Sequence, residues 1–241
     1  GAGSQAVGDL GTATGAMSYA GNFGATALGH SAQAGAYYSL ALGAGSISLA
    51  DGGIAIGTDT YVDPLAYLGV AIGGGVSAYG KHSIAIGSLW TTAAGDSAIA
   101  IGGTKACSGF MCIEENTAAR GINSVPLGAG TTAEAEGSTA LGAGAAAYSF
   151  GSIAVGLDAK SWNENAIAIG ARTFAMGDNS VALGSDSVTS RANTVTVGSE
   201  WTGMNRQITG VADGTEAKDA VDKAQLDAVT PAVGGVRAAA V

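Results

Sequence analysis

The stretch that decides the fold runs from Ala166 to Gly198 and reads AIAIG-ARTFAMGDN-SVALG-SDSVTSRAN-TVTVG. Its three apolar-small-apolar-glycine units close at Gly170, Gly184 and Gly198, so the pattern repeats every 14 residues. Within each unit large and small side chains alternate, as they do along a β-strand. A repeat of this length, with that alternation inside it, predicts the coils of a parallel β-solenoid, an all-β fold.

The same unit recurs along most of the chain. The closing glycines stand at positions 15, 29, 43, 57, 73, 87, 102, 128, 142, 156, 170, 184 and 198, which predicts thirteen coils. Two residues are inserted in the coil that contains Tyr61 and Tyr67, and the interval after Gly102 is twelve residues longer than one period. We interpret the long interval as one loop inserted over residues 103–120. Each coil is expected to hold two short strands and two corners, and each strand to pair with its equivalent in the next coil.

Composition excludes several classes of protein. The 241 residues include 41 glycines, but no Gly-X-Y period is present, which excludes collagen, and the 47% of hydrophobic residues argue against disorder. Few aromatic residues are available, so any core must be thin and layered. A net charge of −9 with only ten Lys and Arg offers no basic stripe for nucleic acid.

The alternation also predicts which side chains face which way. In Val181-Ala182-Leu183 the two large residues share one face and Ala182 lies on the other. We expect the large residues to be buried within the coil and the alanines, Ala168 and Ala182 among them, to form a smooth surface for another chain. Two aliphatic side chains per coil and the ladder hydrogen bonds do not offset the conformational entropy of ordering fourteen residues. The rod is therefore expected to associate laterally with copies of itself.

The repeat stops after Gly198, and a different pattern follows. From residue 216 to 229 apolar residues recur near helical spacing, which predicts a helix with Thr215 as its N-cap and Glu216 in its first turn. Pro231 ends that helix or marks a new segment. So short a helix is marginal alone, so we expect it to start a coiled coil with its own copies.

Two cysteines, Cys107 and Cys112, lie in the inserted loop. Their closeness in an otherwise cysteine-free chain favours a local disulfide over two unrelated thiols, and hence an oxidising compartment. The chain holds no run of eighteen apolar residues, and repeat-like sequence begins directly at Gly1. We therefore expect it to be a fragment that lacks the segments for targeting or anchoring.

Signals for catalysis are weak. His30 and His82 occupy turns of separate coils without a matching nucleophile or carboxylate, so both are interpreted as solvated turn residues. Asp59 and Asp63 could hold a cation, but a solvated loop is favoured because no calcium-binding repeat recurs. The glycines at 73–75 lie in a corner and not before a long helix, so a phosphate site is disfavoured. No catalytic residue, metal ligand or cofactor site is predicted.

The repeats over residues 1–200 are followed by the stretch RQITGVADGTEAKDAVDKAQL from Arg206 to Leu226. The chain resembles the YadA-like head and neck of trimeric autotransporter adhesins of Gram-negative bacteria: the repeats carry the resemblance to the head, and that stretch carries the resemblance to the neck. The resemblance implies a homotrimer of left-handed parallel β-rolls, a neck over 201–215, and the start of a helical stalk or connector over 216–241. It also implies display at the outer membrane through a C-terminal barrel and binding to extracellular matrix such as collagen, fibronectin or laminin. The trimeric or structural positions that it suggests are Ala168, Ala182, Gly170, Gly184, Gly198, Arg206, Gln207, Ile208 and Leu226. The Cys107 loop and Pro231 depart from the plain pattern.

Several functions compete for such a rod. An adhesin would bind through many weak contacts on identical coils, whereas the alternative is a structural spacer that projects another adhesive domain. Solenoid enzymes need longer coils or a catalytic histidine, and an ice-binding face needs a Thr-x-Thr ladder of which only Thr12 to Thr14 is present. Our hypothesis for the ligand face is the outward set Arg172, Phe174, Asp186 and Val188, with the Cys107 loop as a side protrusion. The alternative is that these residues only keep the surface soluble.

Overall fold

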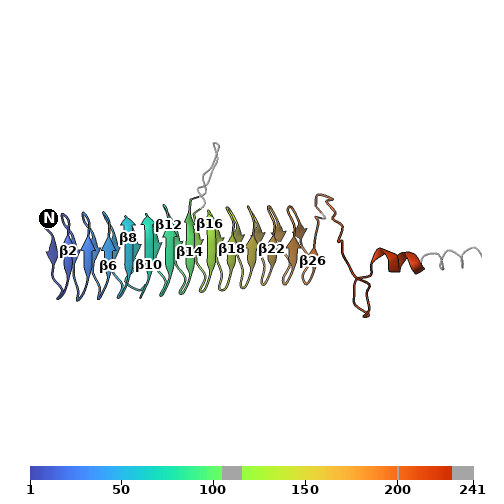
Figure 1. The fold of residues 1–241 in the computed structure, drawn as a ribbon, viewed down its shortest axis with the longest axis horizontal. Helices are drawn as coiled ribbons and strands as arrows, with labels where there is room; N and C mark the ends of the chain where they lie inside the picture. Colours follow the sequence, from blue (N-terminus) through green and yellow to red (C-terminus); the bar gives the residue numbers. More distant parts are fainter. Residues whose placement is uncertain (105–115, 200, 230–241) are drawn as a thin grey trace, which may run out of the picture. The chain divides into compact units, whose positions relative to one another are not determined.

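The head of the protein is a parallel β-solenoid (Figure 1). The structure is a computed structural model that describes residues 1–104, 116–199 and 201–229. The chain divides into two units, Gly1–Met204 and Asn205–Val241. The described part of the first unit contains two parallel sheets of 13 strands each, with one strand of each sheet in every coil, which confirms the thirteen coils.

Sheet A contains the odd-numbered strands and sheet B the even-numbered ones, and both are stacked in chain order. The strands of sheet A are β1 (Gln5–Ala6), β3 (Tyr19–Ala20), β5 (Gln33–Ala34), β7 (Ile47–Ser48), β9 (Tyr61–Val62), β11 (Ser77–Ala78), β13 (Thr92–Ala93), β15 (Ala118–Ala119), β17 (Thr132–Ala133), β19 (Ala146–Ala147), β21 (Lys160–Ser161), β23 (Phe174–Ala175) and β25 (Val188–Thr189). The strands of sheet B are β2 (Thr12–Thr14), β4 (Thr26–Leu28), β6 (Leu40–Leu42), β8 (Ile54–Thr58), β10 (Val70–Gly74), β12 (Ile84–Gly87), β14 (Ile99–Gly103), β16 (Val125–Ala129), β18 (Thr139–Leu141), β20 (Ile153–Val155), β22 (Ile167–Ile169), β24 (Val181–Leu183) and β26 (Val195–Thr196).

The register places chemically equivalent residues on one another. Strands β22 and β24 pair so that Ala168 lies beside Ala182 and Ile169 beside Leu183. The two-residue insertion does not disturb this order: Tyr61 of β9 still pairs with Ser77 of β11. The extra residues are therefore absorbed in the corner between β9 and β10, and the ladder continues through them.

Close stacking explains the corner glycines. Gly73 has a φ of +136°, and a Cβ atom built on it would lie 1.7 Å from the carbonyl oxygen of Gly87 in the next coil. No other residue fits, because both the backbone conformation and the distance to the next coil exclude a side chain. A corner hydroxyl follows three residues after several of these positions: Thr173 Oγ1 donates to the Gly170 carbonyl at 2.7 Å. Ser180 Oγ does the same to the Gly177 carbonyl at the opposite corner, at 2.6 Å.

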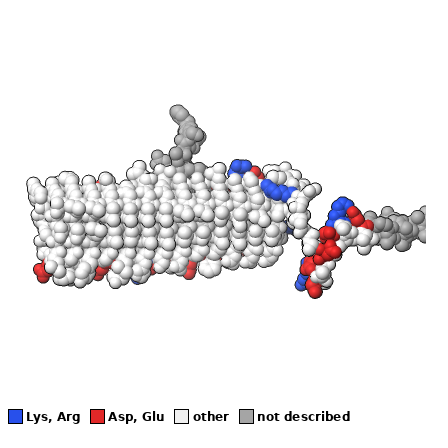
Figure 2. Space-filling model, viewed as in Figure 1, with Lys and Arg blue, Asp and Glu red and all other residues white. Residues whose placement is uncertain are grey.

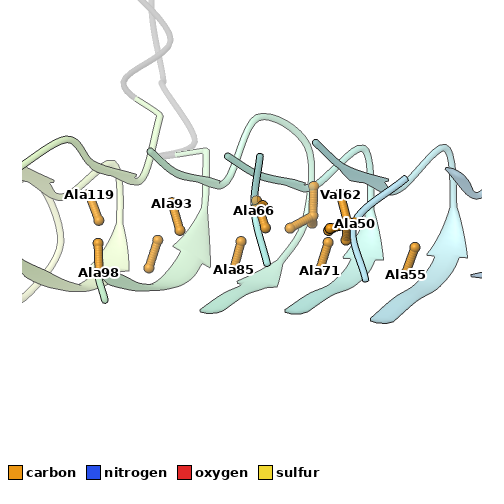
Figure 3. Close-up of a cluster of buried hydrophobic side chains, with 12 residues drawn as sticks. Ala50, Ala55, Val62, Ala66, Ala71, Ala85, Ala93, Ala98 and Ala119 are labelled. Atoms are coloured by element: carbon orange, nitrogen blue, oxygen red, sulfur yellow. The ribbon is translucent and has the colours of Figure 1, made fainter. Parts of the chain in front are cut away.

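The interior of the solenoid is lined with alanine, which corrects the predicted orientation of the strands. Ala168 and Ala182 are fully buried within the single chain, and Figure 3 shows other alanines of the two sheets pointing at one another across the narrow core. Val62 and Val76 are the largest side chains that are fully buried among the described residues. The predicted alanine surface between chains is therefore wrong. With two short strands per coil the sheets lie so close that only small side chains fit between them, and the large aliphatic residues point outward.

The inserted loop leaves and rejoins the solenoid without interrupting it. Thr117 lies just after the loop and Gly103 just before it; Gly103 N–H donates to Thr117 Oγ1 at 3.1 Å. The buried Thr117 hydroxyl lies 2.6 Å from the carbonyl oxygen of Gly128 in the next coil and 2.8 Å from that of Gly103. This one side chain ties both ends of the loop to the next coil, and the pairing of β14 with β16 continues beyond it.

In the described part of the second unit, residues 223–229 form a helix. Its N-cap is Asp222 and not Thr215 as predicted: Asp222 Oδ1 accepts the Gln225 N–H at 2.8 Å, and Gln225 Oε1 accepts the Asp222 N–H at 3.3 Å. The sequence just before it cannot join the helix because Asp219 Oδ2 accepts the N–H groups of Thr215 and Glu216. Within the described residues, no helix has the length and apolar character needed to cross a bilayer.

Candidate binding surfaces

The outer side of sheet B forms a long apolar face, which we call the sheet B face. It consists of the large aliphatic residues at the first and third positions of its strands. Six of the third-position residues are 36–43% exposed, namely Leu28, Ile101, Leu127, Leu141, Ile169 and Leu183. In Figure 2 most of the broad face of the solenoid seen in that view carries no Lys, Arg, Asp or Glu. A continuous apolar surface on this scale is typical of an interface.

The predicted ligand residues lie together on two successive coils near the end of the solenoid. Arg172 and Asp186 occupy the same corner position, with φ of +54° and +60°. Their side chains form a bidentate ion pair, in which Arg172 Nε lies 2.7 Å from Asp186 Oδ1 and Nη2 lies 2.8 Å from Oδ2. The hydrogen bond from Asp186 and its negative charge raise the pKa of the Arg172 guanidinium. Each charge is therefore partly satisfied within the chain.

The other two members of this set differ in exposure. Phe174 and Val188 are partners in the pairing of β23 with β25, on the outer side of sheet A. Phe174 is half-buried, whereas only 8% of Val188 is exposed. Ser199, which follows the last coil, forms an isolated parallel β-bridge with Val188 and lies next to it. Val188 thus lies on the outward side of its strand, as expected, but is covered there and offers little surface to a ligand. Phe174 and the exposed parts of the Arg172 and Asp186 side chains are therefore the members of this set that a ligand can contact.

A groove that the sequence analysis did not predict crosses the corners of three successive coils. Its volume is about 630 Å³, and its middle coil contributes Gly74 and Gly75, which carry no side chains. Leu89 and Trp90 form one wall, and both are exposed, at 59% and 61%. Tyr79, which is 42% exposed, contributes from the outer side of sheet A. The groove is thus a gap in the row of corner side chains, bordered by an aromatic wall.

The opposite wall of this groove is polar. Thr58 and Asp59 contribute to it from the preceding coil, and Ser77, Ser88 and Thr92 complete the lining. Two sequence signals could have found the site: three consecutive glycines at 73–75, and the 15-residue step that lengthens the next corner and carries Trp90. Only the two signals together, an open corner beside a long one, point to a groove.

The remaining candidate residues form no chemical centre. His30 and His82 are exposed turn residues, as predicted, and the His82 ring packs edge-on against Tyr67. Asp63 is used locally, where Oδ1 accepts the Leu65 N–H at 2.9 Å. Among residues 1–104, 116–199 and 201–229, no three His, Cys, Asp or Glu side chains are placed to hold a metal ion. The predicted disulfide between Cys107 and Cys112 falls outside the described residues.

The predicted structural positions have different roles within the chain. Gly170 and Gly184 have φ of +128° and +97° and stack on each other at a corner, and the carbonyl of Gly198 accepts the N–H of Val188 at 2.9 Å. Arg206, Gln207, Ile208 and Leu226 are exposed in the single chain, with Ile208 at 71% and Leu226 at 56%. Their contribution to a trimer stays a prediction.

Gln225, which was not singled out, organises the second unit. Its Oε1 accepts the N–H of Gly214 at 2.9 Å, and its Nε2 donates to the Gly214 carbonyl at 3.1 Å. One amide side chain thus holds the segment before the helix to the first turn of the helix. The pattern D-x-x-Q at 222–225, a capping-box spacing, was the signal available in the sequence.

Comparisons with known proteins agree with the repeat pattern. The family model of the YadA head domain repeat matches residues 20–46, 34–60, 67–89, 119–145, 147–173 and 175–200, which is more than half of the chain. The crystal structure of the collagen-binding domain of the Yersinia adhesin YadA is similar at 29% sequence identity, with a TM-score of 0.47, over 80% of this chain and 83% of that one. No curated protein sequence matches the chain. The thirteen stacked coils and the matched repeats lead to one conclusion: this chain belongs to the YadA head-repeat family, as a YadA-like head of the trimeric autotransporter adhesin type.

Proposed function

We propose that this chain is the host-binding head of a bacterial surface adhesin, and that it attaches to extracellular matrix proteins such as collagen, fibronectin or laminin. The observation that carries the proposal is its membership of the YadA head-repeat family. The head would be displayed outside the cell through an outer-membrane anchor. The proposal assigns it no catalytic activity.

We further propose that the head acts as a homotrimer that associates through the sheet B face. The alanines cannot serve this purpose because they are buried inside the single chain. The aliphatic side chains of the sheet B face, which include Leu141, Ile169 and Leu183, are large, apolar and partly exposed. Parallel association in register would bring identical rows of these side chains together and remove them from water.

The second unit supports the same arrangement. Val221, Leu226 and Val229 are 56–62% exposed on or next to the short helix. Seven residues of this helix lie in the described part of the chain, and a short isolated helix is marginal in water. Packing of these apolar side chains against two copies would stabilise it. We interpret this segment as the point where three chains begin a coiled coil.

The repeated coils would let such a head bind tightly even where each single contact is weak. Thirteen coils on each of three chains present many similar surfaces, and weak contacts at several of them add through avidity. In this view Phe174 and the Arg172–Asp186 pair are one local contact patch among several.

The test measures binding of the purified chain to immobilised collagen, fibronectin and laminin, with its oligomeric state recorded by sedimentation. We expect binding by the trimer and a large loss of apparent affinity for single chains. Phe174→Ala should weaken binding, whereas Lys160→Ala, at the equivalent position one coil earlier, serves as the matched control. A folded trimer that binds none of the three proteins would reject the adhesin proposal and favour the spacer.

A further inference from the structure

We propose that the groove lined by Trp90, Leu89 and Tyr79 is a binding site for a neutral oligosaccharide, with a pyranose ring stacked on the Trp90 indole. This goes beyond the matrix adhesion proposed above, because it assigns a second class of ligand to a defined site. Four properties of the groove carry the inference: its shape, the rigidity of its corners, its polar lining and its charge.

The groove has the size of a small-ligand site and a built shape. Its volume of about 630 Å³ lies within the range for pockets that hold small molecules. Its floor is open because a Cβ atom on Gly74 would meet only one atom within 4 Å, the Thr58 carbonyl oxygen at 4.0 Å. Leu89 leans over Gly75, where a Cβ atom would lie 3.0 Å from Leu89 Cδ2. The hollow therefore depends on two glycines that separate side chains of the flanking coils.

The backbone holds the walls of the groove at a fixed spacing. Gly75 N–H donates to the Thr58 carbonyl at 2.9 Å, and Trp90 N–H donates to the Gly75 carbonyl at 3.0 Å. The backbone at Trp90 has a φ of +66°, which lies in the left-handed region that residues other than glycine and asparagine rarely adopt. Corner residues along the whole solenoid share this conformation, for example Leu68 at +54° and Arg172 at +54°. The corner thus fixes the backbone of a large aromatic residue whose side chain is 61% exposed.

The lining combines the two features that recognise a sugar. The face of an aromatic ring carries partial negative charge, and the C–H groups on the apolar face of a pyranose are complementary to it. Residues with hydroxyl side chains also line the groove, namely Thr58, Ser77, Ser88 and Thr92. Such side chains can exchange hydrogen bonds with sugar hydroxyls. The Thr92 hydroxyl donates to the Trp90 carbonyl at 3.3 Å and keeps its oxygen as an acceptor. Asp59 is also a lining residue, but its carboxylate leans over Gly45 of the preceding coil, where a Cβ atom would lie 2.3 Å from Oδ1, so the hydroxyl residues are the ones that face a sugar.

Charge selects the kind of sugar. None of the residues that line the groove is Lys or Arg, and its one ionised side chain, Asp59, is negative. A sialylated or sulfated glycan would meet no cationic side chain in this lining to offset its negative charge. The lining therefore favours neutral glycans over acidic ones.

The experiment first presents the purified chain to an array of neutral oligosaccharides and their sialylated and sulfated forms. The best neutral glycan is then titrated into a Trp162→Phe/Trp201→Phe variant, in which Trp90 is the remaining tryptophan. We expect its emission to change with saturation. Trp90→Ala and Gly74→Leu should each weaken binding about tenfold or more, the first by removing the stacking surface and the second by filling the floor. Trp162→Ala is the control: Trp162 is an exposed tryptophan that stacks on Tyr148 outside the groove, and its loss should leave the affinity within about twofold.

Several results would overturn the proposal. One is an unchanged Trp90 emission with every neutral glycan at tens of millimolar; another is a preference for acidic glycans. Retained affinity in the folded Gly74→Leu variant would also place the ligand elsewhere. Gly74 has no positive φ and has room for a side chain, so this variant tests the groove even where Trp90→Ala loses structure. The titration reads the groove directly, whether or not the head binds matrix proteins.

Discussion

Serine substitutions at Leu141, Ile169 and Leu183 should separate the chains of the head, because these side chains lie on the sheet B face. The three are 42%, 39% and 43% exposed in the single chain. Full burial of an aliphatic side chain contributes about 1.5 to 3 kcal/mol, so covering these exposed fractions contributes about 2 to 4 kcal/mol per chain. For three chains the loss is about 6 to 11 kcal/mol, which lowers the association constant by about four to eight orders of magnitude.

Sedimentation equilibrium over a range of concentrations measures this effect. We expect the unsubstituted chain to sediment as a trimer and the triple variant to dissociate at the same concentration. Circular dichroism, recorded in parallel, reports whether the β-structure of each chain persists.

The matched control places three serines at exposed apolar corner residues. Ile122, Phe150 and Leu157 are 48%, 53% and 47% exposed, so Ile122→Ser/Phe150→Ser/Leu157→Ser removes as much exposed apolar surface away from the sheet B face. This control should remain trimeric. If the sheet B variant stays trimeric as well, or if the control dissociates to the same degree, association does not use the sheet B face and the reasoning fails.

Three further predictions concern the fold. Ala168→Leu should lower the free energy of unfolding by about 1 to 3 kcal/mol or more, because Ala168 is fully buried between two close sheets; thermal or denaturant unfolding measures this, and an unchanged midpoint would contradict the alanine core. Thr117→Val should cost about 1 to 3 kcal/mol, since it removes the acceptor of the Gly103 N–H and one of the two hydroxyls near the Gly128 carbonyl, which keeps Thr131 Oγ1; equal stability in urea would show that this hydroxyl does not anchor the loop. The pKa of Asp219 is lowered from its ordinary value of 3.8 by two backbone N–H groups, so the turn that it holds is stabilised above that pH and opens only as pH falls below it; NMR titration of those amides should give a midpoint under 3.8, and a midpoint above it would contradict the turn.

The periodicity of the chain was enough to predict most of the first unit. The apolar-small-apolar-glycine unit specifies strands and corners locally, and one period specifies which residues of neighbouring coils pair. The inserted loop and the two-residue insertion were therefore found by counting, and the structure places the two-residue insertion in the corner between β9 and β10. The predicted bounds of the loop, 103–120, were too wide, because Gly103 belongs to β14 and Ala118–Ala119 form β15. The helix start was wrong because Asp222 and Asp219 compete with Thr215 for the same role, and the sequence does not reveal which carboxylate reaches which N–H group.

The candidate sites depended on contacts that periodicity does not describe. Arg172 and Asp186 were predicted on one face, yet their mutual ion pair and the burial of Val188 follow from the stacking of particular coils. The groove arises from three neighbouring corners whose side chains differ: Gly74 and Gly75 in one, Trp90 in the next. The repeat pattern describes only what all corners share, so it does not predict a site that depends on differences between neighbouring corners.

Alternation along the chain determined by itself that large and small residues occupy opposite sides of every strand. Only the tertiary structure decided which side is the interior. The two sheets of one coil are joined by corners of a few residues, and this short connection leaves room between them for the methyl groups of Ala168 and Ala182 but not for Ile169 or Leu183. The spacing of the sheets, which no single strand encodes, therefore turned the aliphatic rows outward and made them the surface available to other chains.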